Sequence, residues 1–145
     1  MSGHYIHRHV VTFDETNLVG NVYFAHYVRW QGHCREGFLL DRAPGVVALL
    51  SGELALVTVD CAVEYYAEGY AGDRLEIRMG LDRITGNRAT MTFDYVRCTD
   101  DREELLARGR QTVACMRRAA HGMEPVPIPD ELRAALAPYD PAGVS

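Results

Sequence analysis

The chain has 145 residues, a mass of 16.2 kDa and a formal net charge of −5. This length suits one domain over residues 1–145, and 48% hydrophobic with 24% charged residues is typical of a globular protein. The acidic balance argues against nucleic acid as the main partner, and no apolar run approaches the ~20 residues that span a bilayer. The N-terminal segment MSGHYIHRHVV has no apolar core of a secretory signal, so we expect a cytoplasmic protein.

The first predicted elements are a strand over residues 4–13 and a long helix over residues 22–40. In HYIHRHVVTF, successive side chains divide between two faces, as in a strand. Residues 14–20 form a turn-rich loop between the two elements. Within the helix, residues of the expected buried face recur at spacings of three and four, namely Phe24, Tyr27, Val28, Gln31, Cys34, Arg35 and Phe38. This long stripe predicts a buried helix, which residues 41–44 end.

Four strand-like runs follow, over residues 53–67, 74–84, 89–98 and 104–118. The first run alternates strictly and predicts one apolar face made of Ala55, Val57, Val59, Cys61, Val63 and Tyr65. Turns of hairpin length join the runs, which favours antiparallel pairing. The tail, about residues 125–145, carries five of the six prolines and is expected to be loose, with one short helix that begins at Asp130. This order predicts an α+β protein with one sheet curled around one buried helix.

The segment ETNLVGNVYFAHYVRWQGHCREGFL resembles the hotdog-fold thioesterases of the 4-hydroxybenzoyl-CoA group. In that group an aspartate stands three residues before a loop glycine, and an aromatic pair and a tyrosine follow. The matching residues are Gly20, Tyr23, Phe24 and Tyr27, whereas Asn17 stands at the aspartate position. The segment is most similar to thioesterases that accompany iterative polyketide synthases in enediyne antibiotic pathways. Those proteins also carry Asn at this position and an Arg on the central helix, here Arg35.

The resemblance implies a hotdog fold, in which a curved antiparallel sheet of about five strands wraps around a long central helix. It implies a thioesterase without cofactor that releases a β-ketoacyl, polyene chain from the acyl carrier protein of an enediyne polyketide synthase. The β-keto acid would then lose CO2 to give a methyl ketone. It also implies a dimer that pairs its sheets edge to edge, with each site between two chains, or a tetramer built from two such dimers. An acidic carrier protein would meet a locally basic surface, for which Arg29 and Arg42 are candidates.

The chemistry that a thioester needs can be placed on these residues. Backbone N–H groups at the start of a helix are unpaired donors at the positive end of its dipole. We expect an oxyanion hole from the backbone of Gly20, Asn21, Val22 and Tyr23. Asn17 is neither a nucleophile nor a base, but its amide can hold a water or the thioester carbonyl, while Arg35 would bind an enolate or carboxylate. The expected pocket-lining residues are Phe24, Tyr27 and Trp30.

Each assignment has an alternative in the sequence. Asn17 could simply complete a turn, and Arg35 could pair with Glu36 or Asp41 on its own helix. If the site uses a carboxylate, the candidates are Asp14, Glu15, Glu36, Glu64 and Glu68. The rival functions are an acyl-CoA thioesterase of primary metabolism, with a phosphate pocket at residues 116–118, and a non-catalytic acyl-binding or carrier-docking protein.

The sequence contains no pattern typical of a metal site, a disulfide framework or a serine catalytic triad. The four cysteines contain no C-x-x-C pair and are expected to be reduced. The six histidines include pairs at His7 and His9 and at His26 and His33, but no third ligand at a usual metal spacing. No serine stands in a G-x-S-x-G motif.

Overall fold

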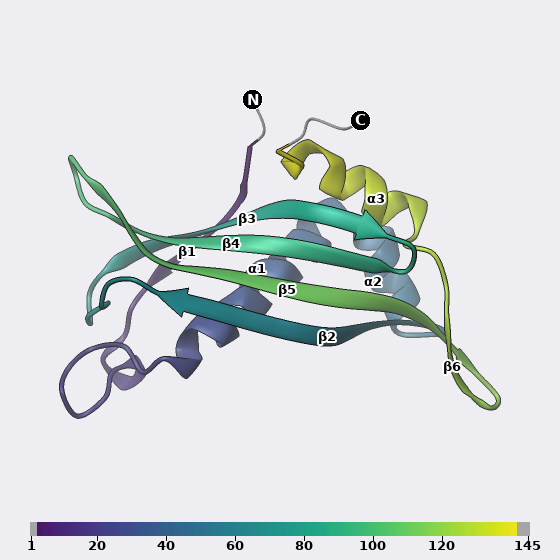
Figure 1. Cartoon of the computed structure of the whole chain (residues 1–145), viewed down its shortest axis with the longest axis horizontal. Helices are drawn as coiled ribbons and strands as arrows, with labels where there is room; N and C mark the ends of the chain where they lie inside the picture. Colours follow the sequence, from purple (N-terminus) through teal and green to yellow (C-terminus); the bar gives the residue numbers. More distant parts are fainter. Residues whose placement is uncertain (1–2, 142–145) are drawn as a thin grey trace.

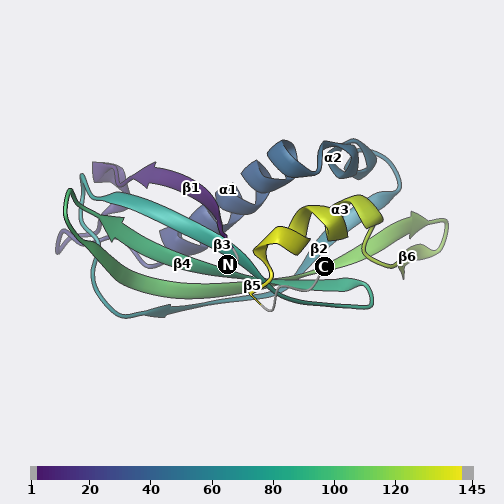
Figure 2. The same ribbon diagram turned by 90° about the horizontal axis from the view of Figure 1, so that it is seen from above.

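One antiparallel sheet curves around helix α1 in the computed structural model, which describes residues 3–141 (Figure 1). The strand order is β1-β3-β4-β5-β2, and the short β6 pairs with β5. The strands are β1 (Tyr5–Val10), β2 (Leu54–Tyr65), β3 (Arg74–Thr85), β4 (Arg88–Cys98), β5 (Glu103–Ala119) and β6 (Gly122–Pro125). The helices are η1 (Phe13–Glu15), α1 (Ala25–Arg42), α2 (Pro44–Leu50), α3 (Asp130–Leu136) and η2 (Ala137–Tyr139). The predicted α+β arrangement is confirmed, and Figure 2 shows α1, α2 and α3 on the same side of the sheet.

Helix α1 is buried along the stripe that the sequence predicts, with Trp30, Cys34 and Phe38 at most 1% exposed. It begins at Ala25, three residues later than predicted, because Val22 forms a β-bridge with Thr16 that keeps the chain extended. It ends at Arg42, since Ala43 precedes a proline and is therefore driven out of the helical region. The helix thus spans the concave face of the sheet, and the loop before it lies at one end of the molecule.

Helix α2 was not predicted from the sequence. Its residues, PGVVALL, form a short apolar run that periodicity cannot assign to helix or strand. Pro44 occupies the first turn, where its missing N–H costs nothing, and Val46 is fully buried. The helix therefore extends the cover of the sheet beyond the end of α1.

Strand β2 is one of the two edge strands of the sheet, and it does not have the single apolar face that strict alternation predicts. A bulge between Thr58 and Asp60 interrupts its register against β5, so that side chains after the bulge change faces. Ala55 is the one buried residue of the strand, while Val57 and Val59 are each 39% exposed. Within residues 3–141, no strand pairs with the outer edge of β2.

The C-terminal segment packs closely as far as it is described, although the sequence predicted a loose tail. Ile128, Leu132 and Leu136 are at most 3% exposed and belong to the core. The predicted short helix is present as α3, and residues 142–145 of the predicted tail, like residues 1–2, lie outside the described residues. None of the helices described is long and apolar enough for a membrane span.

Candidate active site

Asn17 lies in the exposed loop between β1 and α1, and its side-chain oxygen forms part of a turn. Its Oδ1 accepts the N–H of Val19 at 3.0 Å, and its backbone oxygen accepts the N–H of Gly20 at 2.9 Å. Gly20 has a φ of +92°, a conformation that favours glycine. With Oδ1 engaged in the turn, Nδ2 is the end of the Asn17 amide that can donate to a ligand.

The four backbone N–H groups expected to form an oxyanion hole differ in their availability. The N–H of Gly20 donates within the turn, that of Val22 donates to the Gly69 oxygen at 2.8 Å, and that of Tyr23 donates to the Glu15 oxygen at 3.0 Å. In the described part of the chain, the N–H groups of Asn21, Phe24 and Ala25 have no acceptor. The open donors therefore lie at Asn21 and in the first turn of α1, where the helix dipole also favours an anion.

Glu15 is a buried structural carboxylate. Its oxygens accept hydrogen bonds from His9 Nε2 at 2.7 Å, the Thr12 backbone N–H at 2.9 Å and Trp30 Nε1 at 3.1 Å. Burial by itself raises the pKa of Glu15, but these donors outweigh it and lower the pKa to about 2. A carboxylate with this pKa and three donors is a poor general base, so Glu15 anchors the loop.

The aromatic residues expected to line a pocket divide into two groups. Tyr27 and Trp30 are 3% and 0% exposed, and their rings pack against each other with centroids 5.1 Å apart in the core. Phe24 is 58% exposed, and its ring is tilted against that of Tyr23 at a centroid distance of 4.7 Å. Within one chain, Phe24 alone of the three presents a surface to a ligand.

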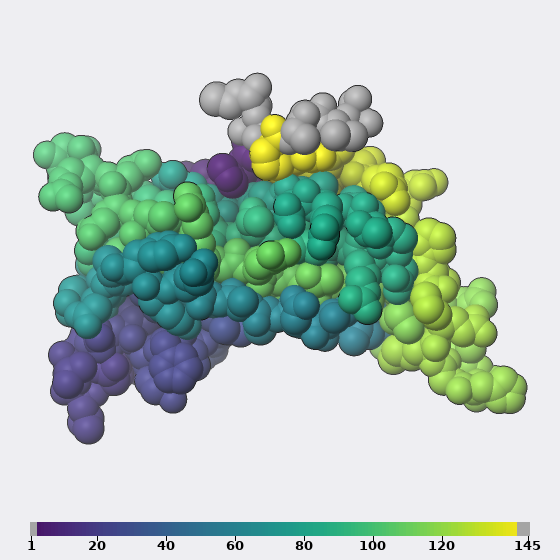
Figure 3. Space-filling view, in the orientation of Figure 1, coloured from purple at the N-terminus to yellow at the C-terminus, as the bar shows by residue number. Residues whose placement is uncertain are grey.

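The loop around these residues carries an exposed apolar surface at one end of the sheet. Its exposed members on the loop and beside it are Phe13, Leu18, Val19, Tyr23, Phe24, Tyr65, Tyr66 and Tyr70. The hydroxyl of Tyr65, the last residue of β2, donates to the Phe24 oxygen at 2.9 Å, which ties the edge strand to the loop. Figure 3 shows the purple loop projecting at a corner of the molecule below β2. A gathering of this size is typical of a surface that another molecule covers.

Arg35 lies on the sheet side of α1 and is held by uncharged groups. Its Nη1 donates to Gln111 Oε1 at 2.6 Å and to Thr58 Oγ1 at 3.2 Å. Gln31, one turn earlier on α1, accepts from Gln111 Nε2 at 3.4 Å and donates to the Ala62 backbone oxygen at 3.2 Å. Burial lowers the pKa of Arg35, and no salt bridge to a carboxylate joins it among residues 3–141.

A groove of about 450 Å³ begins beside Arg35 and runs under α2. Apolar side chains from α1, α2 and β2 form most of its walls, and these are Leu39, Leu40, Val47, Leu50, Leu54, Ala55, Leu56 and Val57. Met123 and Arg118 also line it, together with Glu36. A charged group at Arg35 followed by apolar walls suits an extended apolar ligand with a polar or anionic end.

Two buried side-chain polar atoms have no hydrogen-bond partner in the described chain, Asn21 Oδ1 and Arg35 Nε. Such an atom typically costs about 1–3 kcal/mol, so native proteins rarely keep one without a function. Both residues were predicted from the sequence to belong to the site. The two atoms mark the loop and the groove entrance as the places where an additional molecule would complete the hydrogen bonding.

The loop and Arg35 do not meet within one chain. Arg35 follows Ala25, the first residue of α1, by ten residues, which is about 15 Å of helix. The N–H donors near Asn21 and the Arg35 guanidinium therefore form two separate half-sites in the single chain.

The remaining carboxylate candidates are exposed. Glu36 lines the groove, Glu64 accepts from the Tyr66 hydroxyl at 3.4 Å, and Glu68 accepts from the Tyr70 hydroxyl at 2.7 Å. No side-chain hydrogen bond joins any of them to Asn17 in the part of the chain that the structure describes, although Gly69 and Tyr70, which follow Glu68, pair with Val22 and Asn21. The arginines of the alternative phosphate pocket at residues 116–118 already have partners in the chain. Arg118 donates to the backbone oxygens of Gly52 and Leu54, and Arg117 pairs with Glu124.

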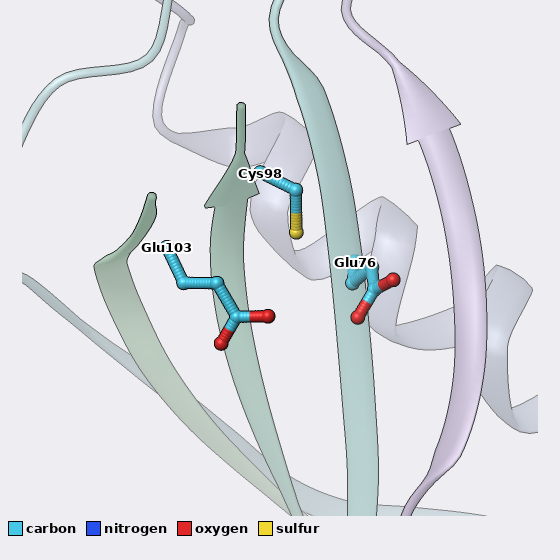
Figure 4. A group of neighbouring side chains, drawn as sticks. All are labelled: Glu76, Cys98 and Glu103. Atoms are coloured by element: carbon cyan, nitrogen blue, oxygen red, sulfur yellow. The ribbon is translucent and has the colours of Figure 1, made fainter. Parts of the chain in front are cut away.

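A group of metal-ligand types lies on the sheet, apart from the residues of the candidate site. Glu76, Cys98 and Glu103 come from neighbouring strands and point toward one another (Figure 4). Arg78 already contacts both carboxylates, with its Nη2 2.9 Å from Glu76 and 2.7 Å from Glu103. The guanidinium compensates their charge, and the group forms an ion-pair network on the sheet.

Sequence reasoning missed the residues that hold Arg35. Gln31 stood at a buried position of an apolar stripe, which is itself a signal that its amide needs a partner. Gln111 and Thr58 carried no comparable signal, because their role depends on the pairing of β5 with β2 and on the bulge.

Comparisons with known proteins bear on both fold and chemistry. A family model described as "Thioesterase-like superfamily" matches residues 11–136. The crystal structures of the dynemicin thioesterase, described in terms of induced-fit and allosteric effects upon polyene binding, include a chain 67% identical to this one. That match has a TM-score of 0.91 and covers 94% of this chain and 97% of the other.

Two more distant proteins agree with this match. Acyl-CoA thioester hydrolase YbgC of Escherichia coli is 30% identical over 106 residues, 73% of this chain and 77% of that protein. A 4-hydroxybenzoyl-CoA thioesterase structure is 13% identical with a TM-score of 0.79 and covers 90% of this chain and 96% of its own, which shows the common fold.

Proposed function

As a member of the thioesterase-like superfamily this chain is a hotdog-fold thioesterase, and we propose that its substrate is a β-ketoacyl thioester on an acyl carrier protein. The carrier would belong to an iterative polyketide synthase of enediyne biosynthesis, which would place the protein in the cytoplasm. The observation that carries this proposal is the setting of Arg35, a half-buried cation whose hydrogen bonds go to uncharged groups, with its Nε unpartnered in residues 3–141.

The setting of Arg35 favours a substrate with anionic character. A cation taken from water is stabilised by a negative partner. Gln111 and Thr58 supply no negative charge, and the exposed Glu36, whose charge raises the pKa of Arg35 against the effect of burial, makes no salt bridge with it in residues 3–141. The enolate form of a β-ketoacyl group, or the carboxylate of a β-keto acid, can accept from the guanidinium. A saturated acyl chain offers no such acceptor, so this setting favours the β-keto substrate.

The loop supplies the other half of the chemistry. The thioester carbonyl would accept from the open N–H groups of Asn21, Phe24 or Ala25, and one such donor is worth about 3 kcal/mol of transition-state stabilisation. Asn17 Nδ2 would donate to the same carbonyl or hold the attacking water. Water oxygen bonds to the carbonyl carbon, the carrier thiolate leaves and takes up a proton, and a β-keto acid is released. Loss of CO2 from that acid gives an enol and then a methyl ketone.

The groove indicates the nature of the acyl chain. Its apolar walls beside α2 fit an extended hydrocarbon, and the 67% identical dynemicin thioesterase is described as binding a polyene. We therefore assign a polyene chain to the groove, with its β-keto end at Arg35.

A dimer through β2 would bring the two half-sites together. The Tyr65 end of β2 is tied to the loop, whereas its Leu54 end lines the groove. Antiparallel pairing of two β2 strands sets the Tyr65 end of one chain beside the Leu54 end of the other. The loop of one chain would then stand over the groove of its partner, and two such dimers could form a tetramer.

The carrier protein would dock on basic groups beside the site. Arg29 and Arg42 are both exposed on α1, and no salt bridge occupies either of them in the described structure. Their charges complement an acidic carrier protein, whose attached thioester must reach the start of the same helix.

The test is single-turnover release from a β-ketoacyl carrier protein, measured by mass spectrometry beside the matching saturated acyl carrier protein and the matching β-ketoacyl-CoA. We expect rapid loss of the β-ketoacyl chain from the carrier with methyl ketone formed. Equal cleavage of the saturated chain would refute the β-keto assignment. Preference for the CoA thioester would favour primary metabolism, and tight binding without cleavage would leave a carrier-docking protein.

A further inference from the structure

The amides of Gln111 and Gln31 form a buried chain that ends on Arg35. Arg35 Nη1 donates to Gln111 Oε1, Gln111 Nε2 donates to Gln31 Oε1, and Gln31 Nε2 donates to the Ala62 backbone oxygen. Gln31 and Gln111 are 0% and 4% exposed, so water does not compete for these bonds. The chain crosses from α1 to both β5 and β2.

The direction of this chain follows from its ends. A guanidinium only donates and a backbone oxygen only accepts, so each amide between them must turn its oxygen toward Arg35 and its nitrogen toward Ala62. The two amides therefore have one consistent orientation. The contact at the Arg35 end, 2.6 Å from Nη1 to Gln111 Oε1, is short, as expected for a charge-assisted hydrogen bond.

Gly109 leaves the space that the Gln31 amide occupies. A Cβ at this position would lie 2.2 Å from Gln31 Nε2 and 3.1 Å from the Ala62 oxygen. The backbone of Gly109 does not have a positive φ, so space is the requirement that glycine meets here. Any side chain at 109 would push Gln31 away from Ala62 and break the chain at its anchored end.

The uncharged nature of Gln111 has its own effect. A glutamate at this position would also accept from Arg35, but it would neutralise the guanidinium inside the site. Glutamine holds the guanidinium in place and leaves its positive charge for another partner, while Nε remains unpaired in the described chain. Thr58, at 3.2 Å, is a weaker second contact on the same nitrogen.

We propose that Gln111, oriented by Gln31 in the space left by Gly109, is a positioning residue that aims Arg35 and reserves its charge for an anionic group on the acyl chain. This inference rests on the proposed function, because it explains how the site would distinguish β-ketoacyl from saturated thioesters. Gln111 acts through Arg35 and need not touch the substrate.

The experiment compares Gln111→Met and Gln111→Glu with the full-length wild-type enzyme. The measured quantity is the ratio of kcat/KM for the β-ketoacyl carrier protein to kcat/KM for the saturated one. We expect both variants to lower this ratio by roughly 10- to 100-fold, the range of one hydrogen bond to a charged group. Gln111→Glu keeps an acceptor for Arg35 but adds a negative charge and loses the donor to Gln31 Oε1, whereas Gln111→Met loses both hydrogen bonds and adds no charge.

The matched control is Thr112→Val on the adjacent position of β5. Thr112 is also buried, it bonds Thr90 at 2.9 Å, and it lies on the opposite face of the sheet from Gln111. This variant removes a buried hydrogen bond of the same strand without touching Arg35. It should keep the wild-type ratio, and thermal unfolding followed by circular dichroism establishes that all three variants are folded.

A double-mutant cycle separates positioning from a structural role. In an Arg35→Met background, Gln111→Met should cause no further loss of the ratio if it acts only through Arg35. A ratio that survives in both Gln111 variants, or additive losses in the cycle, would overturn the inference while the wild-type preference stands. A wild-type enzyme with no preference would overturn the proposed function, and the inference with it.

Discussion

The indole Nε1 of Trp30, at 0% exposure within α1, donates to Glu15 Oε2 in the preceding loop at 3.1 Å. This bond joins the central helix to the segment that carries Asn17 and the open N–H groups. The backbone oxygen of the same Glu15 accepts from Tyr23, just before α1 begins. The geometry of the loop therefore depends on one carboxylate and one indole that take no part in the chemistry.

The stability of the protein should depend on pH through Glu15. Its pKa is lowered from 4.5 to about 2 in the folded state, so its contribution is fully present above pH 4.5 and is lost as the pH falls toward 2. The shift corresponds to a contribution on the order of 3 kcal/mol at neutral pH. Glu15→Gln should lower the free energy of unfolding by a similar amount at pH 7 and by much less at pH 3, measured by urea titration. Asp14→Asn, at an exposed neighbouring position, is the control, and an equal effect at both pH values would contradict the prediction.

Arg35→Lys should reduce turnover of the β-ketoacyl thioester more than turnover of the saturated one. Lysine keeps a positive charge but lacks the planar fork that contacts Gln111 and Thr58 while leaving Nε for a ligand. We expect kcat/KM for the β-keto substrate to fall by about 10- to 100-fold. Arg29→Lys on the exposed side of α1 is the matched control for hydrolysis of a small thioester without a carrier protein.

Asn17→Asp should keep the turn and broaden the substrate range. An aspartate oxygen can accept the Val19 N–H as Asn17 Oδ1 does, and the second oxygen can act as a base toward water. Hydrolysis of the saturated thioester should rise by about tenfold or more, since a positioned base typically contributes at least that factor. Asn17→Ala, which removes both turn acceptor and donor, should lower turnover of every thioester tested. No gain for Asn17→Asp would mean that water does not approach at this residue.

Filling the groove should shorten the chain that the enzyme accepts. Val47→Trp places a large side chain into the wall beside α2, and we expect kcat/KM for long acyl chains to fall by about tenfold while short chains are unaffected. Leu49→Trp is the matched control, because Leu49 is 54% exposed on the same helix and does not line the groove. Steady-state rates over a series of chain lengths provide the measurement.

A charge on the free edge of β2 should prevent assembly and abolish turnover together. Val59, at the bulge, is 39% exposed, and Val59→Lys would place a cation where a second β2 strand is proposed to pair. Size-exclusion chromatography with light scattering should show a smaller species, and hydrolysis should fall in the same fractions. Val10→Lys, on the opposite edge strand β1, should change neither. Full activity in a monomeric Val59→Lys variant would show that one chain contains the whole site.

Regular periodicity accounts for what the sequence predicted well. The buried stripe of α1 and the alternation in β3 and β4 persist over ten residues or more, so their period identifies the element type. The failures share a different cause. α2 and β6 span seven and four residues, too few to show a period, and the bulge at Thr58 breaks an alternation that looks perfect in the sequence.

For the candidate site, too, residues in a local sequence pattern could be named in advance, whereas a residue that depends on distant strand pairing could not. Asn17 and Arg35 were assigned to the site through the resemblance, and their roles stay a prediction, while the turn that Asn17 forms with the Val19 N–H is visible in the structure. Tyr27 and Trp30, expected to line a pocket, are core residues, since aromatic side chains on the inner face of a central helix pack against the sheet. Gln111 could not be predicted from the sequence, because its contact is with Arg35, which lies 76 positions away in the chain.

The hydrogen bond between Trp30 and Glu15 also gives an intrinsic fluorescence signal for the contact between α1 and the loop. Trp30 is the sole tryptophan of the chain, so all indole fluorescence comes from the contact between helix and loop. An emission spectrum that moves to longer wavelength when an acyl carrier protein binds would mean that the loop lifts from α1 to admit the thioester. A constant spectrum through a full turnover would mean that the loop stays docked and that substrate enters along a path already open.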